Sequence, residues 1–153
     1  MYYKINQKKV MDKDTFYMNQ ALKLARQAYD DGEVPIGAVI VCNDKIISKA
    51  YNQTERLNDV TAHAEMIALT SAMNNIGAKY LKNCTLYVTL EPCNMCAGAT
   101  YWAQIKQIAF AAYDKKRGFL QNKNITHPKT KIKGGVLETE SLELLQKFFK
   151  EKR

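Results

Sequence analysis

The chain contains few residues of the kinds that build linkers or membrane spans. Only 3 prolines and 7 glycines occur among its 153 residues, and no Pro/Gly/Ser-rich linker, internal repeat or low-complexity segment interrupts it. No run of about 18 apolar residues is present, and residues 1–6 lack the apolar stretch of a secretory signal. A chain of this length matches a single domain of the commonest size. The sequence therefore predicts one domain spanning residues 1–153, in the cytoplasm, without a membrane partner.

Cysteine is scarce, and its spacing disfavours several kinds of site. The 4 cysteines include one C-x-x-C pair, Cys93 and Cys96, and no second pair that would complete a zinc ribbon. Cys42 and Cys84 stand alone in apolar, strand-like segments, where a free cysteine usually packs as a small hydrophobic residue. A lone C-x-x-C could still be a redox pair. Thiols needed as metal ligands are expected in a reducing compartment, which agrees with the cytoplasm.

Acidic residues are outnumbered by basic ones, 15 to 23, which gives a net charge of +8 at neutral pH. This excess favours a polyanionic partner, although basic enzymes with small substrates are common and charge runs are often merely solvated. Many of the basic residues follow the C-x-x-C pair. The candidates for contacts with a nucleic-acid backbone are Lys116, Arg117, Lys150, Lys152 and Arg153.

Two short motifs supply the residues of a metal centre. His63 precedes Glu65 by two positions, and Cys93 and Cys96 follow a proline. Structural zinc sites close all four positions with Cys and His, whereas catalytic zinc sites use three protein ligands and leave one position for water. Three ligands (His63, Cys93 and Cys96) with Glu65 to spare therefore predict a hydrolytic Zn²⁺ centre, one per subunit. Taken alone, His63 would more often be a packed core histidine, and the cysteine pair a redox or structural site.

Helix geometry limits how these residues can meet. The segment from residue 62 to 69 favours a helix, with Thr61 as its expected N-cap. Residues two apart diverge by about 200° around an α-helix, so His63 and Glu65 converge only if His63 lies in an irregular first turn. Cys93 and Cys96 lie three apart at the head of a second expected helix, on one face. The positive end of that helix lowers thiol pKa values and favours two thiolates.

Hydrophobic periodicity predicts the remaining elements. A helix capped by Asp14 or Thr15 should end at Gly32, and the helix after Thr61 should run to about residue 75. Strands are expected over residues 34–41, 45–50, 86–90, 105–111 and 131–137, a loop over 116–128, and a last helix from residue 138 or 139. Strands alternate with helices after the first hairpin, which indicates a mixed sheet with helices on both faces.

Longer strings around the metal motifs resemble a known family. They are E-V-P-I-G-A-V from Glu33, D-V-T-A-H-A-E from Asp59, and T-L-Y-V-T-L-E-P-C from Thr85, continued by M-C-A-G-A. The pattern H-x-E…P-C-x-x-C is the known signature of zinc deaminases of nucleobases. Over nearly its whole length the chain resembles the cytidine-deaminase-like superfamily, and within it the bacterial tRNA-specific adenosine deaminases. The resemblance implies an α/β fold, a three-layer α/β/α sandwich around a five-stranded mixed sheet. It also implies a homodimer that converts the wobble adenosine of a tRNA anticodon stem-loop to inosine.

The resemblance also assigns roles to individual positions. His63, Cys93 and Cys96 match the zinc ligands and Glu65 the proton shuttle, while Asn52 matches an asparagine that hydrogen-bonds the target nucleotide. Asn52 could instead end the hairpin, because asparagine favours turns. The other substrate-binding candidates are Val34 and Leu90 as apolar pocket positions, Ala64, and Asp114 as an acid near the neighbouring nucleotide. Asp114 could equally be a turn residue or a surface charge.

The sequence departs from the tRNA enzymes at a few positions. Tyr113 stands where they usually have a basic residue, and Tyr101-Trp102-Ala103 is similar to a string in guanine deaminases. The loop over residues 116–120 also differs from the common version. Two alternatives therefore stay open. One is a guanine or cytosine deaminase of free bases; the other is a zinc-stabilised RNA-binding module, which Glu65 disfavours because binding alone does not need that carboxylate.

Overall fold

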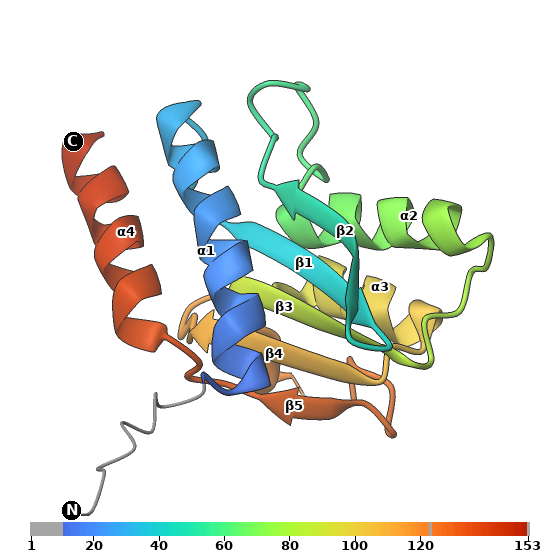
Figure 1. Cartoon of the computed structure of the whole chain (residues 1–153). Helices are drawn as coiled ribbons and strands as arrows, with labels where there is room; N and C mark the ends of the chain where they lie inside the picture. Colours follow the sequence, from blue (N-terminus) through green and yellow to red (C-terminus); the bar gives the residue numbers. More distant parts are fainter. Residues whose placement is uncertain (1–10, 123, 153) are drawn as a thin grey trace, which may run out of the picture.

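A five-stranded sheet lies between two layers of helices in the computed structural model, which describes residues 11–122 and 124–152 (Figure 1). The elements follow one another as α1 (Lys13–Asp30), β1 (Gly37–Cys42), β2 (Lys45–Tyr51), α2 (Ala64–Ile76), β3 (Cys84–Leu90), α3 (Asn94–Ala103), β4 (Gln107–Ala112), the short 3₁₀ helix η1 (Phe119–Gln121), β5 (Lys131–Lys133) and α4 (Glu138–Glu151). The predicted α/β sandwich is confirmed.

The sheet is mixed, with strand order β2-β1-β3-β4-β5. Strand β1 pairs antiparallel with both β2 and β3, whereas β3, β4 and β5 run parallel. Parallel neighbours require a crossover connection, which α3 supplies between β3 and β4. As a result, β3 and β4 end at the same edge of the sheet, next to the start of α3.

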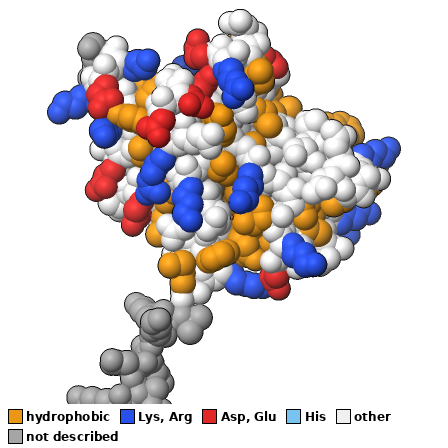
Figure 2. All heavy atoms as spheres, turned by 45° about the horizontal axis from the view of Figure 1, so that its top comes forward, with side chains coloured by type: hydrophobic (Ala, Val, Ile, Leu, Met, Phe, Trp, Pro, Cys, Tyr) orange, Lys and Arg blue, Asp and Glu red, His pale blue; other side chains and the backbone are white. Residues whose placement is uncertain are grey.

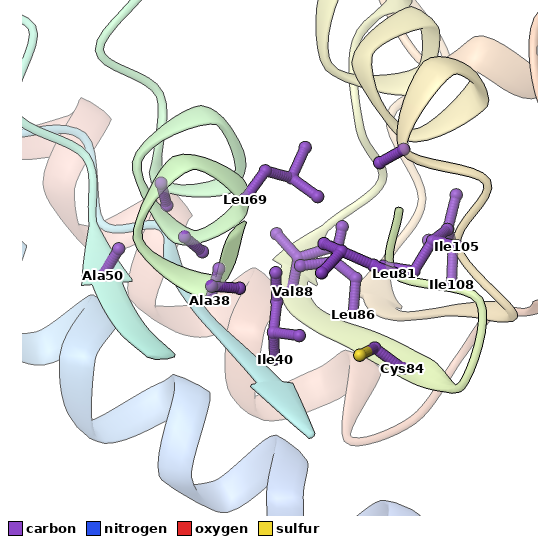
Figure 3. Packing of buried hydrophobic residues seen from close by; sticks show 14 of the residues in the cluster. Ala38, Ile40, Ala50, Leu69, Leu81, Cys84, Leu86, Val88, Ile105 and Ile108 are labelled. Atoms are coloured by element: carbon purple, nitrogen blue, oxygen red, sulfur yellow. The ribbon is translucent and has the colours of Figure 1, made fainter. Parts of the chain in front are cut away.

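Each face of the sheet is covered by a different pair of helices. Helices α1 and α4 pack on one face and on each other, and α2 and α3 lie together on the opposite face (Figure 1). The larger core lies under α2 and α3, where Ile40, Leu86 and Val88 of the central strands meet Leu69 of α2 (Figure 3). This packing holds the N-termini of α2 and α3 in fixed positions above the sheet.

Several predicted boundaries were wrong, each for a local reason. The N-cap of α1 is Asp12, whose carboxylate accepts from the Thr15 backbone N–H at 3.0 Å, and the helix ends before Gly32, which has φ +78°. Strand β1 begins at Gly37, where α1 lies so close that a Cβ would be 2.0 Å from the Ala21 carbonyl oxygen. Strand β5 stops at Lys133, before two glycines. No helix in the described part of the chain is long and apolar enough to cross a membrane.

Candidate metal centre and active site

The candidate metal ligands lie at the N-termini of two neighbouring helices. His63 is the N-cap of α2, with φ −69° and ψ 151°, and Cys93 is the N-cap of α3, with φ −71° and ψ 171°. Cys96 lies in the first turn of α3. The prediction that Thr61 is the N-cap of α2 was therefore wrong, because His63 occupies that position. Its extended backbone is the irregular start that the spacing of His63 and Glu65 requires.

The three side chains converge on one point. The Nδ1 atom of His63 lies 3.6 Å from the Sγ of Cys93 and 3.5 Å from the Sγ of Cys96, and all three ligand atoms lie within 4.8 Å of one another. Ordinary zinc bond lengths and a tetrahedral angle separate a nitrogen and a sulfur ligand by about 3.6 Å. The cluster therefore fits one zinc ion, and its nitrogen and sulfur donors are those that zinc prefers.

The two thiols differ in proton affinity. The pKa of Cys93 is lowered to about 4, chiefly by a hydrogen bond with Cys96 and also by one with His63. The pKa of Cys96 is raised, because Cys96 is the proton donor to Cys93 and because it is buried. The expectation that both sulfurs bind the metal as thiolates stays a prediction. Metal binding must release the Cys96 proton, which makes the affinity pH-dependent.

Glu65 lies beside this cluster and is almost completely buried. Its side chain is 4% exposed, and among the described residues its Oε1 is the buried side-chain atom without a hydrogen-bond partner. Burial raises the pKa of this carboxyl group, and a hydrogen bond with Cys93 raises the pKa of His63. A buried carboxyl with a free oxygen and a raised pKa has the properties of a proton-transfer group.

The metal-binding region matches a family of known chemistry. Residues 11–112 match the model of the cytidine and deoxycytidylate deaminase zinc-binding region. The protein belongs to this deaminase family. The tRNA-specific adenosine deaminase of Aquifex aeolicus is 44% identical over 145 residues, which cover 90% of this chain and 95% of that protein.

Two solved structures show which deaminases the chain resembles in fold and sequence. One, from work on A-to-I editing by tRNA:A34 deaminases, is 40% identical and superposes with a TM-score of 0.80 over 86% of this chain and 99% of its own. The other, a guanine deaminase from Bacillus subtilis, is 41% identical but covers 67% of this chain and 66% of its own, with a TM-score of 0.63. The likeness to the tRNA enzymes therefore extends over more of both chains.

The predicted substrate-binding residues lie near strand ends and at the start of α2. Asn52 directly follows β2 and is 5% exposed, and its backbone N–H donates to the Ile36 carbonyl at 3.0 Å. Leu90, the last residue of β3, and Val34 are half-buried, while Ala64 is the buried first residue of α2. Their contacts with a nucleotide stay a prediction.

Asp114 has a structural role in its own loop. Its Oδ1 accepts from the backbone N–H groups of Lys116 at 3.1 Å and Arg117 at 3.0 Å. The alternative that Asp114 is a turn residue is thus borne out by these contacts. A role in substrate binding would have to use the rest of this half-buried carboxylate.

The predicted basic residues do not form one patch. Lys116 and Arg117 are exposed on the loop after β4, where Gly118 pairs with Cys93 across an isolated β-bridge. Lys150 and Lys152 lie at the end of α4, on the opposite helix layer from the metal cluster, and Arg153 lies outside the described residues. Figure 2 shows lysine and arginine side chains scattered among apolar ones over one face.

The remaining thiols pack as expected and take no part in the cluster. Cys84 is 1% exposed, and burial together with a hydrogen bond that its thiol donates to Cys42 raises its pKa to about 12. Cys42, its antiparallel partner across β1 and β3, is partly buried against the larger core. The metal-binding cluster found among the described residues consists of His63, Cys93 and Cys96.

Two further glutamates are buried, although no sequence motif marks them as functional. Glu33 is 1% exposed, and its carboxylate accepts from the backbone N–H groups of Glu55 at 3.2 Å and Arg56 at 2.7 Å. Glu91 is 4% exposed and also accepts two backbone N–H groups. Both residues lie in the strings that resemble the deaminase family, but their contacts are with distant loops, which local patterns do not reveal.

Proposed function

We propose that the protein deaminates the wobble adenosine of a tRNA anticodon to inosine. The observation that supports this most strongly is the buried carboxyl of Glu65 beside a three-ligand cluster, in a chain similar to tRNA-specific adenosine deaminases along nearly its full length. The reaction consumes one water and releases ammonia. It needs a metal position open to water, a proton shuttle and a pocket for the base, and the chain offers residues for each.

His63, Cys93 and Cys96 are the proposed zinc ligands, one ion per subunit. Bound zinc lowers the pKa of a water molecule and so makes a nucleophile available at neutral pH. Glu65 accepts the proton of the attacking water and delivers it to the ring nitrogen next to the carbon under attack. The same carboxylate then takes the proton of the new hydroxyl group on that carbon and donates it to the departing amino group, which leaves as ammonia while the carbonyl forms. Its raised pKa suits a group that must hold a proton between these steps.

Asn52, Val34, Leu90 and Ala64 are the proposed pocket residues. Asn52 is buried at the end of β2, where its amide can hydrogen-bond the target nucleotide. Val34 and Leu90 offer apolar surface to the base, and Ala64 separates His63 from Glu65 without filling the pocket. Asp114 is proposed to contact the neighbouring nucleotide.

An anticodon stem-loop is a suitable partner because its loop bases are unstacked and can enter a pocket. Lys116 and Arg117, on the loop that touches Cys93, are proposed to contact the flanking phosphates. Lys150 and Lys152 at the end of α4 are proposed as more distant contacts, and Arg153, outside the described residues, is a further candidate from the sequence. Because tRNA is the substrate, we propose that the enzyme acts in the cytoplasm. We also propose that the chain is a single domain, because α1 and α4, far apart in sequence, pack on one sheet.

We further propose that the enzyme is a homodimer, as the resemblance to the tRNA enzymes implies. Trp102 on α3 is 77% exposed and packs edge-to-face on Tyr101 at 5.5 Å between ring centroids. Met95 of the same helix is 37% exposed. A second copy covering this apolar surface would remove it from water. Sedimentation equilibrium tests the proposal: we expect a dimer, and a Trp102→Lys variant should shift it toward monomer.

A panel of substrates separates the proposed function from its alternatives. The zinc-loaded protein is incubated with a stem-loop carrying a wobble adenosine, with free guanine and with free cytosine. We expect inosine in the stem-loop and no turnover of the free bases. Because a guanine deaminase is 41% identical over part of the chain, fast turnover of guanine without the stem-loop would favour that alternative. Binding of the stem-loop without any deamination would favour the RNA-binding module.

A further inference from the structure

Glu91 connects the end of β3 to the metal-binding turn. It lies between Leu90 and Pro92, two residues before Cys93, and its backbone N–H donates to the Ala112 carbonyl of β4 at 2.7 Å. Its side chain is 4% exposed although it carries a carboxylate. Burying such a group is costly unless its oxygens are hydrogen-bonded.

Both oxygens of this carboxylate are used by one loop. The Asp114 backbone N–H donates to Oε2 at 2.9 Å, and the Leu120 backbone N–H donates to Oε1 at 2.9 Å. The Phe119 N–H donates to the Pro92 carbonyl at 3.0 Å. The loop from residue 114 to 120 is thus closed around Glu91 and fastened to the segment that carries Cys93.

Gly118 shows how close this approach is. A Cβ at this position would lie 2.1 Å from the Glu91 Oε1 and 2.5 Å from the Asp114 carbonyl oxygen. The φ angle of Gly118 is −66°, which alanine adopts without strain. The glycine is therefore required by space and not by backbone conformation.

We infer that Glu91 is a positioning residue that sets the loop over residues 114–120 relative to the metal centre. Asp114 is held at its N–H by Glu91, and its carboxylate in turn fixes the backbone of Lys116 and Arg117. Three residues proposed to contact RNA thus depend on one buried carboxylate. The inference rests on the proposed function in so far as that loop contacts the substrate.

Only a carboxylate fits this role. It accepts hydrogen bonds at both oxygens, whereas a glutamine of the same shape offers one acceptor and would turn its NH₂ group toward the second backbone N–H. Hydrogen bonds to a carboxylate are also stronger than those between neutral groups. Glu91→Gln should therefore release one end of the loop while keeping the packing volume.

The test uses the full-length, zinc-loaded protein and a wobble-adenosine stem-loop. Loss of a hydrogen bond to a carboxylate predicts that Glu91→Gln raises KM for the stem-loop about tenfold and leaves kcat within about twofold. Zinc content should be unchanged. In hydrogen–deuterium exchange, the amides of Asp114 and Leu120 should exchange faster. Gly118→Ala should push the loop away from the same carboxylate and give the same changes in KM and exchange. This variant replaces Glu91→Gln in the test if Glu91→Gln does not fold.

Glu33→Gln is the matched control, because Glu33 is equally buried and also accepts two backbone N–H groups, those of Glu55 and Arg56. It should speed exchange at Glu55 and Arg56 and leave Asp114 and Leu120 unchanged. An unchanged KM in Glu91→Gln, or equal loosening of both loops by both variants, would overturn the inference. If the unmodified protein does not deaminate the stem-loop, the proposed function fails instead, while the exchange experiment still tests the loop.

Discussion

Glu65 is the residue on which the proposed chemistry depends most directly. It is buried, its Oε1 lacks a partner among the described residues, and its pKa is raised by burial. Glu65→Gln keeps the shape and removes the proton acceptor. Positioned proton transfer contributes about 10²–10⁴-fold to a rate, so we expect kcat to fall by at least that factor with zinc content unchanged. Near-normal turnover by the zinc-loaded variant would remove Glu65 from the shuttle role.

The thiols give a second test at the level of single residues. Cys93→Ala and Cys96→Ala each remove a proposed ligand, so these variants should lose zinc and unfold at lower temperature, since metal affinity is linked to folding free energy. Cys42→Ala and Cys84→Ala lie outside the cluster and should keep stoichiometric zinc. Metal analysis of the four purified variants measures this. Zinc loss in either of the second pair would show that the ligands were wrongly assigned.

At the scale of elements, the Asp14 carboxylate connects α1 to two strands of the sheet. The Tyr87 hydroxyl of β3 donates to the Asp14 carboxylate of α1 at 2.7 Å, and Lys133 of β5 pairs with the same carboxylate. Tyr87→Phe should lower the free energy of unfolding by about 1 kcal/mol. Urea unfolding at neutral pH measures this loss, with exposed Tyr80→Phe as the control.

The same contact predicts a pH dependence with a definite sign. Burial, followed by the hydrogen bond to Asp14, raises the pKa of Tyr87 above its ordinary value. Because the folded pKa is the higher one, the contribution of Tyr87 to stability is complete below about pH 10, its unfolded pKa, and is lost as the pH rises further. The stability difference between the unmodified protein and Tyr87→Phe should therefore shrink above that pH. A constant difference would contradict the assigned contact.

Local sequence predicted the elements better than their ends. All five strands and the four long helices were expected, most of them from their apolar patterns, although β5 is an exposed strand of only 3 residues. The ends coincide with contacts from outside the element, which local sequence does not reveal. Gly37 begins β1 where α1 lies close to it, and His63, the N-cap of α2 in place of Thr61, contacts the two thiols.

At the scale of the whole molecule, the chain has a net charge of +8, and the described lysine and arginine side chains are scattered over the face shown in Figure 2. Charge reversal of Lys116 and Arg117, on the loop fastened to Cys93, should weaken stem-loop binding and reduce the log–log salt slope by about 0.7–0.9 per lost phosphate contact. Reversal of Lys150 and Lys152, across the sheet, should act less strongly. Lys79 and Lys82, beyond the far end of α2, are a control with the same change in net charge. Equal effects of all three pairs would indicate unspecific attraction.

The metal centre could be predicted from sequence because zinc chemistry restricts its ligands to few residue types at fixed spacing. The contacts around the metal centre could not be predicted in this way. In the sequence, Glu91 is simply the residue after a strand. Its hydrogen bonds to the backbone of Asp114 and Leu120 appear only when residues 114–120 fold against it. Asp114 likewise fits both a turn and a substrate contact in sequence, and the structure shows the turn.

The proposed deamination of the wobble adenosine is tested most directly by asking whether it depends on the position of the adenosine. Two stem-loops are compared with the zinc-loaded protein, one with its sole anticodon adenosine at the wobble position and one with that adenosine moved to the next position. Inosine is measured by nuclease digestion and chromatography. We expect inosine in the first stem-loop and none in the second. Equal conversion of both, or conversion of neither alongside rapid turnover of free guanine, would contradict it.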